Sequence, residues 1–252
     1  MKIQYCSDLH LEFPENQRYL KENPIEPLGD ILILAGDILP FTLNHKEFEF
    51  FDFVSERYEI VYWLPGNHEY YHSDVASYGN YQYRKIRKNV LIVDNIKIEV
   101  GEINLIFSTL WSKINPENEF HVMRSVSDFH VIRYNGKRLL PEHFNALHER
   151  SLEFLAISND EKQGEKTIMV THHVPTLINY PEQHKNSPLN DAFTVELFDF
   201  IEQCNFDYWI YGHHHVNIGD FEIGKTKLLT NQLGYVKYNE QKNFSAHKII
   251  EL

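Results

Sequence analysis

Cysteines, basic residues and long apolar runs are all scarce in this chain of 252 residues. Its two cysteines, Cys6 and Cys204, are too few for a disulfide framework, and we expect both to be small buried hydrophobic residues. No apolar stretch approaches the roughly 20 residues of a membrane-spanning helix. The chain starts directly with a strand-like run and shows no signal peptide, so the expected location is the cytoplasm.

Basic side chains are outnumbered by acidic ones. The 24 Lys and Arg residues face 36 Asp and Glu residues, which gives a formal net charge of −12. This balance argues against a protein that binds along nucleic acid or on an anionic membrane, because both need a Lys- and Arg-rich surface. An anionic substrate stays compatible with it, since a bound metal ion supplies local positive charge.

The chain contains no repeat, low-complexity tract or Pro/Gly/Ser-rich linker, so we expect a single domain over residues 1–252. Its length is sufficient for a core that supports a buried polar site. Two long polar segments, residues 72–89 and 112–142, are expected to be loops or small lids over one edge, because their Arg, Tyr and charged residues would not pack a core.

Short β-rich runs alternate with helical stretches, which predicts an α/β fold. Five near-continuous apolar runs indicate strands covered on both faces: residues 2–7, 30–36, 59–66, 166–172 and 206–213. Helices are predicted over 45–58, 143–158 and 194–204, and Asn44 with Glu47 forms a possible capping box for the first. Residues 104–111, 226–231 and 245–252 form a separate group of strand-like runs, which indicates a second sheet or the far side of a mixed one.

Each of the five apolar runs ends in residues that bind metals. In chain order these are Asp8 and His10, then Asp37, then Asn67 and His68, then His172 and His173, and finally His213, His214 and His215. Ligands of open α/β sheets bind outside the carboxyl ends of the strands, so the five segments are expected to meet at one site. A single such motif is as often structural as functional, but five at matching strand ends indicate a site.

Alternation along an extended segment divides the histidine triplet. Side chains at positions i and i+2 of a strand face the same way. Asp8 and His10 are therefore expected to reach one point, and His213 and His215 to do the same. His214 is then a bystander or faces the substrate.

The ligand types favour a pair of divalent ions. Imidazole nitrogens with carboxylate and amide oxygens, and no cysteine cluster, exclude iron–sulfur and thiolate zinc sites and suit Mn, Fe, Zn, Co or Ni over Ca or Mg. The candidate ligands are more than one ion needs, and Asp37 is the natural bridge because its carboxylate has two oxygens. Two divalent ions with Asp8 and Asp37 leave a positive surplus that attracts a hydroxide and a phosphate, as in two-metal phosphoester hydrolases.

The order of these motifs resembles that of the calcineurin-like metallophosphoesterases. The blocks D-x-H, G-D, G-N-H-E, H and G-H-x-H are all present between residues 8 and 215, and the runs at 108–111, 127–133, 189–193 and 230–235 are similar to those of small bacterial members. The resemblance implies a four-layer α/β/β/α sandwich of two mixed sheets flanked by helices.

The resemblance also implies roles for individual residues. It places Asp8, His10, Asp37 and His215 on one metal ion, and Asp37, Asn67, His172 and His213 on the other. His68 is left as the general acid, oriented by Asp37 or a nearby carboxylate. His172 is preferred over His173 as the ligand because it closes its strand, and His173 is assigned to a supporting or phosphate contact.

Asp128, Arg133 and Asn190 are candidates for lining the substrate pocket, although a surface salt bridge explains Arg133 equally well. Glu69 receives no metal role, and its charge is expected to serve backbone or helix-end groups.

The resulting hypothesis is a phosphoester hydrolase acting on a phosphorylated small molecule or nucleotide. A hydroxide between the ions attacks phosphorus and His68 protonates the leaving group. Monoester and diester substrates both fit. A nuclease of the same superfamily is one alternative, disfavoured by the acidic charge and by the lack of a basic strip interleaved with aromatic residues. A non-catalytic metal-binding scaffold and a purely structural metal clamp are the others, and the retained His68 and the polar segments count against them.

Overall fold

The computed structural model describes residues 1–160, 166–204 and 206–252, and its centre is a pair of six-stranded mixed sheets. The first sheet has the order β14 (Ile249–Glu251), β1 (Lys2–Cys6), β2 (Ile31–Ala35), β3 (Ile60–Leu64), β5 (Val90–Asp94) and β4 (Gln82–Lys85). Its four inner strands run parallel, and β14 and β4 are antiparallel at the two edges.

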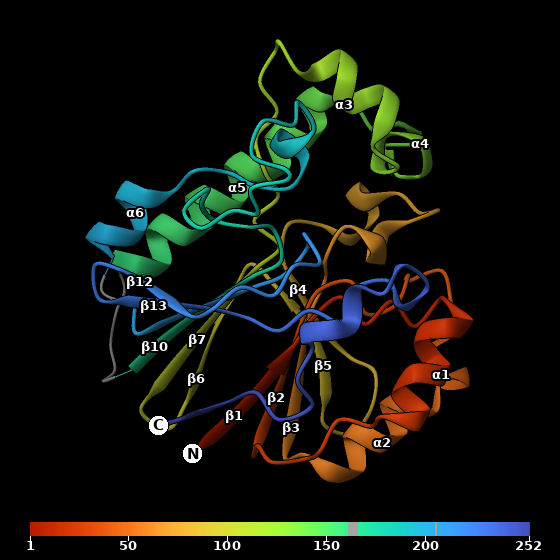
Figure 1. Ribbon diagram of the computed structural model, residues 1–252, viewed down its shortest axis with the longest axis vertical. Coiled ribbons are helices and arrows are strands. Elements are labelled where there is room, and N and C mark those ends of the chain that lie inside the picture. The colour runs from red at the N-terminus through yellow and green to blue at the C-terminus, as the bar shows by residue number, and fades with distance from the viewer. Residues whose placement is uncertain (161–165, 205) are drawn as a thin grey trace.

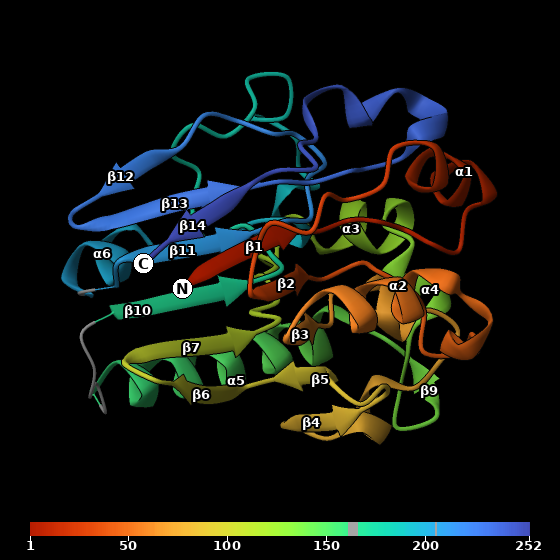
Figure 2. The same ribbon diagram turned by 90° about the horizontal axis from the view of Figure 1, so that it is seen from below.

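The second sheet repeats this plan. Its order is β12 (Phe221–Ile223), β13 (Thr226–Thr230), β11 (Tyr208–Tyr211), β10 (Lys166–Thr171), β7 (Ile103–Ser108) and β6 (Ile96–Val100). The inner strands are again parallel, with β12 and β6 antiparallel at the edges. Figure 2 shows the parallel strands of both sheets seen from below.

Helices cover the outer faces of the two sheets, and apolar side chains fill the space between the sheets. The inner layer combines residues of the first sheet, such as Ile33, with residues of the second, such as Phe107. On the outer face of the first sheet lie α1 (Pro14–Glu22) and α2 (Glu49–Arg57), and on that of the second lie α5 (Pro141–Asp160) and α6 (Phe198–Gln203) (Figure 1). The predicted four-layer α/β/β/α sandwich is confirmed.

The assignment of strands to sheets differs from the expectation. Strands β7 and β13 belong to the second sheet, but β14 pairs with β1 in the first. Strands β10 and β11, which carry candidate ligands, lie in the second sheet and not with β1, β2 and β3. Apolar periodicity shows that a strand is buried on both faces, but it does not reveal the strand's neighbours.

The predicted helices differ at their ends. Residues 45–58 split into a 3₁₀ turn at His45–Glu47 and α2, and the Asn44 side chain caps the turn by accepting from the Lys46 amide at 3.2 Å and donating to Glu47 at 2.9 Å. The helix predicted at 194–204 begins only at residue 198, because Thr194 forms a β-bridge with Val174. Helix α5 extends the predicted 143–158 by two residues at each end.

The two polar segments contain structure of their own. Residues 72–89 include β4, and residues 112–142 include α3 (Glu119–Ser125), α4 (Asp128–Val131) and the hairpin of β8 (Arg133–Tyr134) and β9 (Lys137–Arg138). Figure 1 shows α3 and α4 beyond one end of the sheets. The expectation that these segments cannot pack a core is wrong, because apolar residues between their charges form a buried cluster with Phe144 that includes Val75, Val122, Phe129 and Leu139.

Both cysteines are buried, as expected. Within the described ranges, no helix combines the length and apolar character needed to cross a membrane. The single domain over 1–252 and the cytoplasmic location stay predictions.

Candidate metal centre

Five loops from both sheets meet beyond the carboxyl ends of their strands. They bring together two groups of side chains whose nitrogen and oxygen atoms lie within 4.8 Å of one another: Asp8, His10, Asp37 and His215 in the first, and Asp37, His172 and His213 in the second. Asp37 belongs to both groups. The Asn67 Oδ1 atom lies 3.2 Å from His172 Nε2, next to the second group. All seven predicted metal ligands therefore lie around one centre.

The backbone conformation of the candidate ligands differs from the extended one that was expected. Strands β1 and β11 end at Cys6 and Tyr211, before the candidate ligands. Five of the ligands have left-handed backbone torsions, with φ of 56° at Asp8, 46° at His10, 55° at Asp37, 82° at His213 and 55° at His215. Asp8 and His10 do reach one point, as expected, but not as alternating residues of a strand, and His213 and His215 enter different groups, contrary to the expectation. Left-handed torsions are uncommon outside glycine and cluster at functional sites.

In the first group, each imidazole directs one ring nitrogen towards the centre, and a hydrogen bond to a carboxylate holds the other. The Nε2 atoms of His10 and His215 approach to 2.9 Å at the centre. On the outer side, His10 Nδ1 donates to Glu12 Oε1 at 3.2 Å and His215 Nδ1 donates to Glu240 Oε2 at 2.7 Å. A carboxylate on the outer nitrogen is the usual partner of a metal-binding histidine, because it fixes the tautomer and the ring orientation.

The second group follows the same rule with backbone carbonyls. His172 Nε2 and His213 Nδ1 lie 3.1 Å apart at the centre. Their other nitrogens donate to the carbonyl oxygens of Ala35 at 2.9 Å and Ala192 at 3.2 Å. The inner nitrogens, His172 Nε2 and His213 Nδ1, are therefore available to bind a metal ion.

The two imidazoles of each close pair differ in the direction of their pKa shifts. Burial lowers the pKa of His215, but hydrogen bonds to Asp8 and Glu240 outweigh it and raise the pKa to about 10. Burial also lowers the pKa of His172, and Asp37 raises it to about 9. The partners His10 and His213 have their pKa lowered, chiefly by burial. The surrounding carboxylates thus favour positive charge in both groups, and the donor set of imidazoles, carboxylates and an amide suits divalent transition metals.

Glycine next to the centre leaves space that a side chain would fill. A Cβ atom at Gly66 would lie 2.2 Å from Asp37 Oδ1 and 2.5 Å from His172 Nε2. A Cβ atom at Gly212 would lie 2.6 Å from Asp8 Oδ2. These residues permit the ligands' close approach to the backbone.

His68 lies beside both groups and is not counted in either. Its Nδ1 donates to Glu12 Oε1 at 2.9 Å, and its Nε2 lies 3.2 Å from the Tyr235 hydroxyl and 4.0 Å from Asp37 Oδ2. The Tyr71 ring stacks on the imidazole, with 4.0 Å between centroids. Burial lowers the pKa of His68, but Asp37 and Glu12 raise it above its usual value. These two carboxylates therefore favour the protonated form of the imidazole.

Three carboxylates support the ligands, and the sequence pointed to only one of them in this role. Glu69 is fully buried and accepts from the backbone amides of Asp37 at 3.0 Å, Ile38 at 2.7 Å and Gly66 at 2.7 Å. It serves backbone groups, in line with the expectation. Glu12 and Glu240 were missed. The alternation of Asp8, His10 and Glu12 was a signal for the first, whereas Glu240 follows His215 by 25 residues and no motif marks it.

The predicted substrate contacts divide into two pairs. A cavity of about 360 Å³ opens beside the metal centre, and Asp128 and Asn190 line it. His173 does not: it is fully buried, with Nδ1 3.2 Å from the Thr109 carbonyl oxygen. Arg133 lies on β8 and lines a different hollow. His173 and Arg133 thus lie outside the lining of this cavity, and their contacts with substrate stay predictions, whereas the His173 ring packs 4.3 Å from that of His213, as a supporting residue would. His214 lies in the cavity wall, and burial lowers its pKa to about 4.

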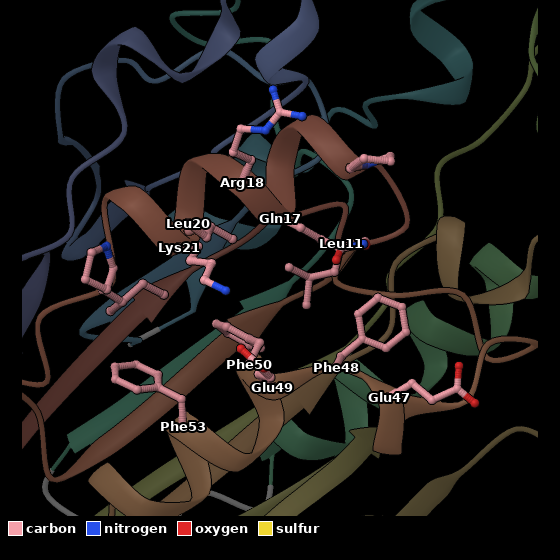
Figure 3. Close-up of a pocket in the computed structure, with 13 residues that line it drawn as sticks. Leu11, Gln17, Arg18, Leu20, Lys21, Glu47, Phe48, Glu49, Phe50 and Phe53 are labelled. Atoms are coloured by element: carbon pink, nitrogen blue, oxygen red, sulfur yellow. The ribbon is translucent and has the colours of Figure 1, made fainter.

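A second hollow of about 610 Å³ lies between α1 and α2. Phe48, Phe50 and Phe53 line one side and Leu20 and Lys21 the other (Figure 3). Among the described residues of its wall, none belongs to the two groups around Asp37. The candidate metal ligands therefore lie beside the smaller cavity and not beside this hollow.

Comparisons with known proteins place the chain in a family. Residues 1–217 match the family model described as calcineurin-like phosphoesterase, and the chain belongs to this family. It is 31% identical over 287 residues to the uncharacterized protein L509 of Acanthamoeba polyphaga mimivirus, a match that covers 99% of this chain and 96% of that protein. Its fold is similar to that of phosphopantetheinyl hydrolase (PptH) from Mycobacterium tuberculosis, with a TM-score of 0.67 and 17% identity over 99% of this chain and 95% of that one.

Proposed function

We propose that the protein is a dinuclear-metal-dependent phosphoester hydrolase acting on a phosphorylated small molecule. The observation that carries the proposal is the convergence of four imidazoles, each with its outer nitrogen fixed, on the shared carboxylate of Asp37. We assign one ion to Asp8, His10, Asp37 and His215, and the other to Asp37, Asn67, His172 and His213. Two divalent ions of the Mn, Fe, Zn or Co type would polarise the phosphoryl oxygens and activate water.

His68 is the proposed general acid. Glu12 accepts from Nδ1, so in the protonated imidazole the second N–H is at Nε2, and this is the proton available to a leaving group in the cavity. The stacked ring of Tyr71 restricts the imidazole, so the proton has a fixed direction. The cavity volume of about 360 Å³ is typical of small-molecule sites, which supports a small phosphoester as substrate.

The proposal is tested by leaving-group dependence. We expect His68→Asn to reduce kcat/KM for an alkyl phosphoester by about 10² to 10⁴. The loss on a p-nitrophenyl ester should be much smaller, because p-nitrophenolate leaves without protonation. Equal losses on both substrates would remove His68 from the acid role. His121→Asn, at an exposed histidine of α3, is the matched control and should leave both rates unchanged.

Metal dependence is tested separately. Asp37→Asn should abolish both metal occupancy, measured by elemental analysis, and turnover, because Asp37 belongs to both groups. The assay compares p-nitrophenyl phosphate with bis-p-nitrophenyl phosphate after chelation and return of Mn²⁺, which also separates monoester from diester hydrolysis. An active Asp37→Asn protein that retains both ions would contradict the proposal.

A further inference from the structure

The wall of the cavity beside the metal centre is unusual for a phosphate site in the kind of charge that its described residues carry. Among the described residues that line it, none is Lys or Arg, whereas Asp128 and Glu240 are acidic and Tyr71, Tyr180 and Tyr235 are aromatic. Phosphate groups are commonly held by Arg and Lys side chains. Basic groups in this cavity are thus confined to histidines, and no Lys or Arg among the described lining residues is available to bind a second anionic group on a substrate.

Asp128 lines this cavity, and one of its two carboxylate oxygens has no hydrogen-bond partner among the described residues. Its side chain is 1% exposed, and its Oδ1 atom accepts from the Asn67 amide and from the Tyr71 hydroxyl, each at 2.9 Å. Its Oδ2 atom is buried and has no hydrogen-bond partner among the described residues. A buried polar atom without a partner is costly and rare in folded proteins, so it indicates a group that is supplied from outside the chain.

The position of Asp128 places it on the side of the leaving group. Tyr71 stacks on His68 and donates its hydroxyl to Asp128, so a single side chain separates Asp128 from the proposed general acid. A substrate whose leaving oxygen faces His68 would bring the rest of its leaving group towards Asp128. Both residues line the same cavity.

We propose that Asp128 determines specificity by accepting a hydrogen bond from the leaving group of the substrate. The preferred substrates are phosphoesters with one phosphoryl group and a neutral or cationic leaving group that carries an ammonium or hydroxyl donor. Leaving groups with a further anion, such as the nucleotide of a nucleoside diphosphate, are rejected. The inference rests on the proposed hydrolase function and adds the substrate class to it.

The test uses three small phosphomonoesters that differ in one group. O-phosphoethanolamine carries an ammonium, glycerol 3-phosphate hydroxyls and phosphoglycolate a carboxylate. Each is measured as a competitive inhibitor of whichever p-nitrophenyl ester the metal-loaded protein hydrolyses. We expect phosphoglycolate to bind at least about tenfold more weakly than O-phosphoethanolamine, because charged hydrogen bonds and like-charge contacts in a buried site reach that size. ADP should bind more weakly than AMP by a similar factor.

The substitution Asp128→Asn removes the charge and keeps an oxygen for Asn67 and Tyr71. We expect the variant to prefer O-phosphoethanolamine over phosphoglycolate by no more than about threefold. This corresponds to less than the 1.4 kcal/mol of a tenfold difference in affinity. Asp199→Asn, at an exposed position of α6, makes the same charge change outside the cavity and should leave the preference intact.

Two results would overturn the inference. One is a wild-type protein that hydrolyses phosphoesters but binds the three compounds equally, a measurement that needs no variant. The other is an Asp128→Asn protein whose kcat falls by the same factor on every substrate while the preference is retained, because Asp128 would then only orient Asn67. Absence of turnover with every phosphoester and metal would instead refute the proposed function, and the inference with it.

Discussion

Replacing Glu69 by glutamine should destabilise the protein strongly, although Glu69 is not a candidate metal ligand. Its Oε2 atom accepts from the amides of Asp37 and Gly66, and its Oε1 atom accepts from the Ile38 amide and from Trp63 Nε1 at 2.8 Å. These donors belong to the segments that follow β2 and β3 and to β3 itself. One buried side chain thus holds both segments.

The size of the effect follows from the number of donors. Glutamine keeps one oxygen and replaces the other by an amino group. Whichever way its amide turns, at least two buried N–H groups then face a donor and lose their acceptor. Each unsatisfied buried group costs about 1–3 kcal/mol, so the free energy of unfolding should fall by about 2–6 kcal/mol. That is a large part of the 5–15 kcal/mol that is typical of a folded protein.

Equilibrium unfolding in urea, followed by tryptophan fluorescence, measures the change. The matched control is Glu56→Gln, on the exposed side of α2, which should change the free energy of unfolding by no more than about 0.5 kcal/mol. Affinity for divalent metals should also fall by about 10- to 100-fold, since Glu69 holds the backbone of Asp37. A loss of stability below about 1 kcal/mol would show that other contacts hold the two segments.

Three further predictions concern the metal centre and its surroundings. Gly66→Ala should weaken metal binding, because its Cβ would lie 2.2 Å from Asp37 Oδ1, and unchanged affinity in a calorimetric titration would contradict this. Asp94→Asn should stabilise the protein by about 4 kcal/mol at pH 8 and by less than half of that at pH 5. Burial raises the pKa of Asp94 to about 7, so above pH 4 the folded state binds more protons than the unfolded state, and the wild type loses on the order of 4 kcal/mol as the pH rises to 7. Equal effects at both pH values in denaturant unfolding would refute this. Metal binding at pH 7 should release about two protons, from His172 and His215, and affinity should rise with pH. Calorimetry in buffers of different ionisation enthalpy measures the release, and buffer-independent heats would exclude it.

Residue order was sufficient to predict the place of the site and the identity of the side chains gathered there. Asp37 follows an apolar strand and His172 closes another, and strand ends of an α/β fold meet at one edge. The choice of His172 over His173 agrees with the side chains' positions: His172 faces Asp37, whereas His173 packs against Trp111.

Features that depend on tertiary packing did not follow from the sequence. The left-handed torsions of Asp8 and His10 depend on how the segment after β1 packs, and the pattern of apolar residues does not predict them. Glu240 contacts His215 only because a 3₁₀ turn at Glu240–Asn243 folds back on the site. The pairing of β14 with β1 joins residues about 250 positions apart, a distance over which periodicity is uninformative.

The two groups of candidate ligands draw on both sheets, since β1, β2 and β3 belong to one and β10 and β11 to the other. A bound pair of ions would therefore connect the two halves of the sandwich at one end, in addition to the apolar packing between the sheets. Movement of one half relative to the other would change the spacing of the ligands around Asp37. Substitutions of Ile33 or Phe107, in the apolar layer between the sheets, should then weaken metal binding although neither residue is a candidate ligand.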